Sequence, residues 1–360
     1  MKAKFYLIAA AACAALAACS KNEVAPVDVD QEITYQTIET KAASGFKDAN
    51  KFTSYAYFLP ETATNWDSDA TSSQTYIDGA EVSYNSANHY WKSTSAYYWP
   101  KKGKLTFFAW STNSAATTMN GATVECSNAT GITVDELNIT TNKNVDFLVA
   151  DIAKDQTANT SFHEDEGGNA WHNGVPTVFK HALSSIAFKA MTVSNGVAYD
   201  YKTNNDIEFY ITSIDIKSDV NRKYTQGNTA SNHTWKDVVG TSSSTLDVLT
   251  PAANIEVTKD APTSTYAPVD DDYKIVMPQT FATADGNTIT VNYDIVYFAT
   301  VGTPVTEHIS KTVDLFDAFG ATGWEPTKKY ILTIKLGLDE ILWDPDVTDW
   351  ALVETPTITL

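Results

Sequence analysis

The residues in this chain best suited to hold a metal ion are two histidines close to a run of acids. The sequence His-Glu-Asp-Glu occupies positions 163–166, and His172 follows shortly afterwards. Imidazole and carboxylate groups are common ligands of divalent metals when rigid elements hold them in place. Gly167, Gly168 and their polar neighbours indicate a loop instead. We therefore expect a solvated acidic loop, with neither a metal nor a cofactor bound.

Two further clusters of aspartates carry oxygen atoms of the kind that calcium prefers. One is the run at 270–272, and the other consists of Asp344, Asp346 and Asp349. Neither contains the glycine turn and the terminal glutamate of an EF-hand loop. We interpret both clusters as acids in turns.

No short motif predicts catalysis. The chain has no Gly-rich phosphate loop and no Gly-x-Ser-x-Gly sequence. Nothing near Cys126 along the chain would lower its thiol pKa, so we expect a small buried apolar residue. His181 lies in an alternating apolar segment and is expected to be a hydrogen-bonded structural histidine. We do not expect an enzyme, since a catalytic site would have to be assembled from distant loops.

The beginning of the chain has the pattern of an export signal. Lys2 and Lys4 precede an apolar run at 5–18, which is too short to span a bilayer as a helix and ends in small residues. We predict that residues 1–18 are a signal peptide, removed from the mature protein.

The sequence Leu-Ala-Ala-Cys at 16–19 matches the lipobox of bacterial lipoproteins. At such a site the Cys19 thiol takes a diacylglycerol and becomes the mature N-terminus, so acyl chains, palmitate among them, would hold the protein to the membrane. By resemblance to lipoprotein sorting rules, Ser20 in place of an aspartate after the cysteine favours the outer membrane. Residues 19–31 would form a tether. The alternative is an ordinary cleaved signal in which Cys19 has no role.

The charge of the chain argues against a nucleic-acid partner. Its 25 basic and 44 acidic residues give a net charge of −19. Arg222 is the only arginine, so bidentate contacts to phosphate or guanine are nearly absent. A polyanion would be repelled by the acidic excess.

Period-two alternation of apolar and polar residues predicts β-strands along most of the chain. It is clearest at 289–301 and 330–338, and a change of parity near Thr212 and Ser213 predicts a bulge between two strand segments. Residues 277–281 would form the hairpin partner of the strand at 289–301. The predicted strand that begins at Leu105 has aromatic residues on both faces, so we expect neither face to be exposed to solvent. The sequence suggests a turn of helix only at residues 314–319.

The length of 360 residues predicts two domains. We place the N-terminal domain at 32–174 and the C-terminal domain, with an extended last strand, at 175–360. The division follows a polar, acidic stretch at 157–168. The fold class predicted is all-β, with antiparallel sandwiches.

Several phrases of the sequence, in order, resemble the fimbrillin family, the lipoprotein-derived subunits of type V pili and related surface adhesins. The phrases are the lipobox, Ile-Thr-Tyr at 33–35 with Thr-Lys-Ala at 40–42, Tyr-Tyr-Trp-Pro at 97–100, Leu-Thr-Phe-Phe-Ala-Trp at 105–110, Asp-Phe-Leu-Val-Ala at 146–150, Phe-Lys-His-Ala-Leu-Ser-Ser-Ile at 179–186, Met-Pro-Gln at 277–279, and Trp-Glu-Pro at 324–326 with the strand at 330–338. The resemblance implies two transthyretin-like β-sandwiches in tandem, a location at the outer membrane and cell surface, and no catalysis.

The resemblance also implies an assembly mechanism. A protease would remove the first strand, 32–40, and a segment of another pilus subunit would fill the groove. The side chains that leave would be Ile33, Tyr35 and Ile38, and the cut would follow Lys41, where the family usually has arginine.

The same resemblance points to the tail at 351–360 as the donor strand. Leu352, Ile358 and Leu360 would enter pockets of the acceptor. Pro356 lacks an amide hydrogen and would need a position that requires no donor.

A different reading is a stand-alone surface lipoprotein that binds a host or dietary glycan, or a host protein. Trp66, Trp91 or Trp171 would then be exposed and form an aromatic platform. Most tryptophans of a sandwich fill its core, so we favour the pilus subunit.

Overall fold

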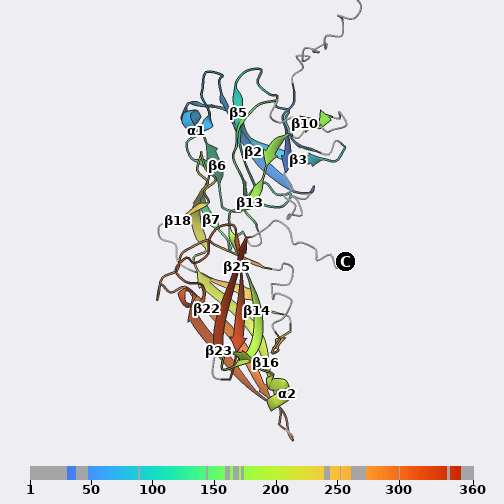
Figure 1. Cartoon of the computed structure of the whole chain (residues 1–360), viewed down its shortest axis with the longest axis vertical. Helices are drawn as coiled ribbons and strands as arrows, with labels where there is room; N and C mark the ends of the chain where they lie inside the picture. The colour runs from blue at the N-terminus through green and yellow to red at the C-terminus, as the bar shows by residue number, and fades with distance from the viewer. Residues whose placement is uncertain are drawn as a thin grey trace, which may run out of the picture.

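A computed structural model of the chain describes residues 31–37, 48–87, 90–142, 145–158, 163–164, 170–171, 174–238, 244–251, 253–260, 273–299, 301–338 and 341–349. The molecule is elongated, with the N-terminal half (31–181) in the upper part of Figure 1 and the C-terminal half (184–349) mostly in the lower part. Strands dominate the described residues, so the all-β prediction is confirmed.

One nine-stranded sheet forms the body of the N-terminal half. Its order is β12-β1-β4-β3-β2-β5-β8-β13, and β9 pairs with β5. The strands are β1 (Thr34–Thr37), β2 (Lys51–Leu59), β3 (Gln74–Asn85), β4 (Tyr90–Ser93), β5 (Lys104–Ser111), β8 (Leu148–Ala150), β9 (Ala153–Gln156), β12 (Val175–Thr177) and β13 (Phe179–His181). Only Val178 separates β12 from β13 along the chain, so the sheet must curl until its two ends approach each other.

This sheet is buried on both faces, which explains the aromatic content of β5. On one face Leu105 and Phe107 join a core that lies within the N-terminal half. On the other face Phe108 and Trp110 join a second core, which continues into the C-terminal half. Because the two sets alternate along the strand, neither face is left for solvent, as the sequence predicts.

Two further sheets form the body of the C-terminal half. The first has the order β15-β14-β24-β25 with β21 beside β14, and the second has the order β19-β16-β22-β23 with β20 beside β16. The strands of the first are β14 (Ser184–Ser194), β15 (Val197–Ala198), β21 (Lys274–Val276), β24 (Lys328–Leu336) and β25 (Ile341–Asp349). Those of the second are β16 (Ile207–Ser218), β19 (Ser244–Leu249), β20 (Ile255–Val257), β22 (Thr288–Tyr297) and β23 (Val305–Asp314). Their inner faces share one core, so they form a sandwich.

The alternating segments fold as expected. Every second residue of β22 from Ile289 to Ile295 is buried, and β24 shows the same alternation. The register of β16 against β22 shifts between Ile211 and Ser213, where the sequence predicts a bulge. One prediction is wrong: β22 pairs with β16 and β23, and residues 277–281 are not its hairpin partner. The turn sequence before β22 shows where the chain can reverse its direction. Which strand becomes the partner of β22 depends instead on how both faces of the strands are buried.

The remaining elements are short. A four-stranded sheet of order β18-β17-β7-β6 takes strands from both halves, and β10 pairs with β11. Their bounds are β6 (Val124–Ser127), β7 (Gly131–Asn138), β10 (His163–Glu164), β11 (Ala170–Trp171), β17 (Asn221–Thr225) and β18 (Thr234–Asp237). The helices are α1 (Trp66–Asp69), the 3-10 turn η1 (Ala70–Ser72), α2 (Tyr201–Asn205) and α3 (Leu315–Phe319). Asp314 caps α3 by accepting a hydrogen bond from the Phe316 amide, so the predicted helical turn is present.

Among the strands that the structure describes, two pairs are parallel, β1 with β12 and β14 with β24, and the other pairs are antiparallel. The pairings of β12 and β13 also connect residues on the two sides of the predicted division at 174/175, since β12 pairs with β1 and β13 with β8. The division into domains at this point stays a prediction.

Candidate functional site

The first strand lies inside its sheet and not at an edge. Tyr35 is paired with Trp91 of β4 on one side and with Val175 of β12 on the other. The pairing is antiparallel to β4 and parallel to β12. Figure 1 shows this strand in blue in the upper part of the molecule. Both sides of the β1 backbone are therefore occupied by neighbouring strands.

The pairing extends to the residues that precede β1. The Ile33 amide donates a hydrogen bond to the Tyr97 oxygen at 2.7 Å, and the Trp99 amide donates one to the Gln31 oxygen at 2.9 Å. Glu32 forms an isolated antiparallel bridge with Tyr98 between these two bonds. Paired backbone therefore runs along the whole described segment 31–37.

Ile33 and Tyr35 carry the apolar contacts of the first strand. Ile33 is fully buried, and Tyr35 has a relative exposure of 1%. The Tyr35 ring meets Phe52 and Phe107 edge to face, with centroid distances of 5.4 and 6.0 Å. Burial raises the pKa of the Tyr35 hydroxyl well above its usual value, so this phenol stays neutral. The predicted side chains of the removable strand are thus part of the N-terminal core.

Gly174 allows β12 to run close beside β1. Its φ of 54° lies in the left-handed region, which favours glycine. A Cβ atom at this position would lie 2.7 Å from the main-chain oxygen of Thr34. Any side chain would therefore push the first strand away from β12.

The other residues that the sequence assigns to export and assembly lie outside the described part of the chain. They are Cys19, Ile38, Lys41, Leu352, Ile358 and Leu360. The described C-terminal half ends with β25, which pairs along its full length with β24. Asp344, Asp346 and Asp349 lie within this strand, so the interpretation of this cluster as acids in turns is wrong, and the run at 270–272 lies outside the described residues.

Two of the three tryptophans proposed for a glycan platform are in the core, so the platform prediction is wrong for them. Trp66 is fully buried against Tyr57 and Phe108, and Trp91 has a relative exposure of 4%. The side chain of Trp171 lies outside the described residues. A large indole is buried where two sheets or two halves meet, and this packing is not visible in the local sequence.

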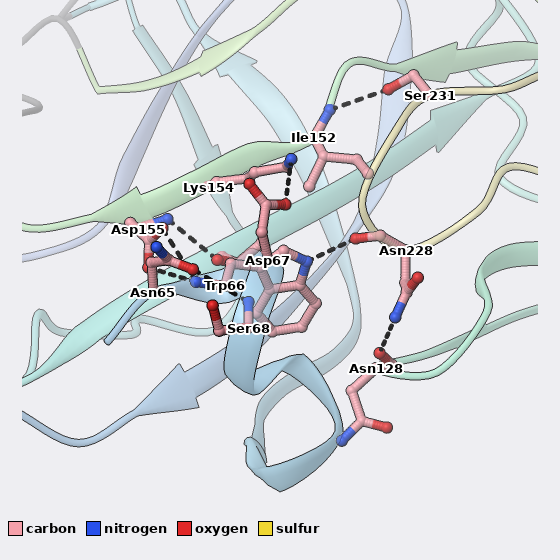
Figure 2. Close-up of polar contacts among 11 residues, drawn as sticks. Asn65, Trp66, Asp67, Ser68, Asn128, Ile152, Lys154, Asp155, Asn228 and Ser231 are labelled. Atoms are coloured by element: carbon pink, nitrogen blue, oxygen red, sulfur yellow. Dashed lines mark hydrogen bonds and ion pairs between the residues drawn. The ribbon is translucent and has the colours of Figure 1, made fainter. Parts of the chain in front are cut away.

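Trp66 belongs to a polar junction between the two halves that the sequence did not reveal (Figure 2). Its indole Nε1 donates a hydrogen bond to the Asn228 oxygen at 2.5 Å, and its amide donates to both carboxylate oxygens of Asp155 at 3.0 and 3.1 Å. Lys154 forms an ion pair with Asp67 at 2.6 Å. No pattern in the sequence indicated these contacts, which join residues far apart in the chain.

The side chains that could do chemistry have structural partners. Cys126 is half buried, and burial raises its thiol pKa to about 12, which leaves it protonated and a poor nucleophile at neutral pH. His181 is buried and its Nδ1 lies 2.8 Å from an Asp146 carboxylate oxygen, as expected for a structural histidine. Among the described residues, no three His, Cys, Asp or Glu side chains gather as metal ligands would.

The described residues include no helix that is both long and apolar enough to cross a membrane.

The fold is similar to that of bacterial proteins of known structure. A fimbrial protein from Bacteroides vulgatus ATCC 8482 has a TM-score of 0.64 at 17% identity, covering 89% of this chain and 100% of that chain. A candidate cell adhesion protein from Parabacteroides distasonis ATCC 8503 has a TM-score of 0.50 at 9% identity, covering 91% of this chain and 98% of that one. At these identities the likeness concerns the fold. No protein with a curated description matches the chain.

A family model described as fimbrillin-like matches residues 33–350, from the first strand to just past β25. This match confirms the resemblance drawn from the sequence phrases, and the protein belongs to the fimbrillin-like family.

Proposed function

We propose that this protein is a structural or adhesive subunit of a surface fimbria, exported as a lipoprotein and assembled by strand donation. The family and the fold shared with a fimbrial protein support the fimbrial role and a location at the cell surface. Its partners would be other fimbrial subunits, a maturation protease and, through lipid on Cys19, the outer membrane. No catalytic role is proposed.

The position of β1 between β4 and β12 is the observation that carries this proposal. Adjacent strands of a sheet lie about 4.8 Å apart, so loss of β1 would leave a gap about 10 Å wide between β4 and β12. Both walls of the gap would present unpaired backbone groups, and its floor would expose the rings of Phe52 and Phe107. An extended segment with alternating apolar residues is the ligand that fits this gap.

Cleavage after Lys41 would not by itself empty the groove. The first strand would still be held by its backbone pairing and by the burial of Ile33 and Tyr35. The incoming strand must therefore displace the old one. Each backbone hydrogen bond that the donor forms in the groove contributes about 0.5–1.5 kcal/mol net, and these bonds offset those lost with the old strand.

The tail at 351–360 is the proposed donor. It begins two residues after Asp349, the last residue of β25. Leu352, Ile358 and Leu360 would replace the buried side chains of the lost strand. Dissociation would require the donor to leave along its whole length, which makes the linkage durable.

Trimming and polymerisation test this mechanism. The chain from residue 20 onward would be treated with a trypsin-like protease, and the products followed by mass spectrometry, size exclusion and electron microscopy. Parent protein cut after Lys41 should form polymers, and Lys41→Gln should keep its first strand and stay monomeric. Lys47→Gln, a matched change in the same stretch, should be cut and polymerise like the parent.

Deletion of residues 351–360 separates the two roles of a subunit. The trimmed deletion variant should accept a donor but should not form chains with itself. Donor-strand assembly through these segments is wrong if trimmed parent protein stays monomeric at high concentration, or if the deletion variant polymerises equally well.

Lipid attachment is tested separately with Cys19→Ala. This change should abolish retention in the membrane fraction, because position 19 then has no thiol to carry the diacylglycerol. Radiolabelled palmitate on the Cys19→Ala protein would contradict the assignment.

A further inference from the structure

Strand β23 forms an exposed edge of the C-terminal sandwich. It pairs with β22 over all ten residues from Val305 to Asp314, and among the described strands no other pairs with it. Figure 1 shows both strands in the lower part of the molecule. Val305 has a relative exposure of 63%, and the His308 side chain has 79%. Half of the backbone hydrogen-bonding groups of an edge strand point away from its sheet and can pair with another strand.

The sequence of β23 is nearly palindromic about Ile309. It reads Val-Thr-Glu-His-Ile-Ser-Lys-Thr-Val from 305 to 313. If a second copy of the strand lies antiparallel with Ile309 opposite Ile309, each valine faces a valine and each threonine faces a threonine. Glu307 then faces Lys311 of the other copy, and this ion pair occurs twice. His308 faces Ser310 in the same arrangement.

The centre of this palindrome is compatible with twofold symmetry. Residues directly opposite each other in a sheet have side chains on the same face, and neighbours along a strand point to opposite faces. A twofold axis perpendicular to the sheet can therefore pass only between two copies of the same residue. A palindrome whose centre lies between two residues could not pair with a second copy about such an axis. The palindrome in β23 is centred on one residue, Ile309, so it can.

The charged residues make this pairing selective. Glu307 and Lys311 are paired with Ile295 and Val291, two buried residues of β22, so they are on the core-facing side of the sheet. Both are nevertheless exposed, because β23 is at the edge. Charges that point inward at an edge oppose pairing with most other strands. In the self-paired register they face opposite charges instead, and opposite-charge pairs across strands are stabilising.

We propose that β23 is a self-association surface, at which two copies of this chain pair antiparallel about Ile309. The two second sheets then join into one continuous sheet across the twofold axis. The contact is separate from the first-strand groove, so it requires no cleavage at Lys41. Subunits, or the fimbriae built from them, would associate side by side through this edge.

Charge exchange tests the register. Uncut protein of residues 20–360 would be studied by sedimentation velocity over a wide concentration range. Lys311→Glu and Glu307→Lys should each raise the dimer dissociation constant by about tenfold or more, because two attractive pairs become repulsive. The double variant Glu307→Lys/Lys311→Glu should restore the parent value. Lys236→Glu, a charge reversal on the exposed strand β18, should leave dimerisation unchanged.

Thermal unfolding of each variant would confirm that the fold is intact, since Glu307 also accepts a hydrogen bond from the Tyr297 hydroxyl at 3.2 Å. The proposal is overturned if the parent is monomeric at all concentrations, or if dimers persist unchanged in both single variants. Because uncut protein is used, this result is independent of whether trimmed protein polymerises.

Disulfide trapping locates the axis. Ile309→Cys should cross-link to itself under mild oxidation, because facing Cα atoms in a sheet are about 4.5–5.5 Å apart, within reach of a disulfide. Thr306→Cys should not cross-link to itself, since its two copies would lie about 20 Å apart. It should cross-link to Thr312→Cys when the two variants are mixed. Efficient cross-linking of Thr306→Cys alone would show a different register.

Discussion

Trp66 donates its indole N–H to the main-chain oxygen of Asn228, a residue 162 positions further along the chain, at 2.5 Å. Asn228 in turn donates its side-chain amide to the Asn128 oxygen at 2.9 Å, as Figure 2 shows. The loop that follows β17 is thus tied to two separate segments of the N-terminal half. These contacts join the halves beyond the shared apolar core.

Replacing Trp66 with phenylalanine should weaken this junction. Trp66→Phe leaves the partly buried Asn228 oxygen without its donor and removes part of a buried ring, so the free energy of unfolding should fall by about 2–4 kcal/mol. Chemical denaturation would measure the loss. Trp324→Phe is the matched control: its ring is also buried, but its indole nitrogen has no hydrogen-bond partner among the described residues. Equal losses in both variants would show that the hydrogen bond contributes little.

Gly174→Ala should loosen the first strand. The added Cβ would meet the Thr34 oxygen at 2.7 Å, and the backbone is in the left-handed region. We expect a loss of about 2 kcal/mol or more in unfolding free energy, and faster proteolysis of residues 31–37. Gly286→Ala has the same kind of backbone strain with nothing within 4 Å, so it should cost about 1 kcal/mol and leave the first strand protected. Unchanged proteolysis in Gly174→Ala would contradict the close-approach argument.

The stability of the protein should decline in mild acid because of His233. Burial, and then the charge of Lys180, lower the pKa of this imidazole to about 4, although Asp151 opposes the effect. The unfolded chain has a histidine pKa of about 6.5, so it binds a proton more readily than the folded protein between these values. Stability should therefore fall as the pH drops from about 6.5 towards 4, by up to about 3 kcal/mol.

His233→Gln should remove this contribution, because glutamine has no charge to gain and can still accept from the Tyr224 hydroxyl, which lies 2.8 Å from His233 Nδ1. Urea denaturation of parent and variant at several pH values between 7 and 4 would measure the difference. Parallel stability curves would show that His233 protonates as readily in the folded protein as in the unfolded chain.

The predicted C-terminal domain can be tested as a fragment of residues 175–360. It should fold as a β protein, because all the strands of its two sandwich sheets lie within the fragment. The core between these sheets continues into the N-terminal half, so the fragment should be less stable than the whole chain. Its residues 175–181 and strand β17 would lack their partners β1, β8 and β7. Hydrogen exchange should therefore show protection in β14, β16, β22 and β24 and rapid exchange in β17. A far-ultraviolet spectrum of a disordered chain would count against the division at 174/175.

Much of the fold could be predicted because strand sterics and burial are local. The alternation in β22 and β24, the bulge near Thr212 and the cap at Asp314 each depend on neighbours within a few residues. The double aromatic face of β5 indicated burial on both sides, and the structure supplies the two cores that cover it. The order of phrases along the chain was enough to identify the family.

Strand partners and buried tryptophans could not be predicted in the same way. Residues 277–281 have the pattern of a partner for β22, but β16 and β23 pair along its two edges and leave no edge for them. Trp66 and Trp91 have no local signal that separates a core indole from an exposed one. Their burial depends on segments far away in the chain.

The sequence by itself determined the strand content, the faces of the strands, the family, and the predictions for Cys19 and Lys41, since these depend on short stretches of residue types. Only the tertiary structure decided that Tyr35 lies between β4 and β12, that Gly174 permits this approach, and that Asn228 is bonded to Trp66. The physical reason is that many strands of similar composition compete for each partner. The pairing that prevails is the one that buries the most apolar surface and leaves the fewest backbone groups unpaired over the whole chain.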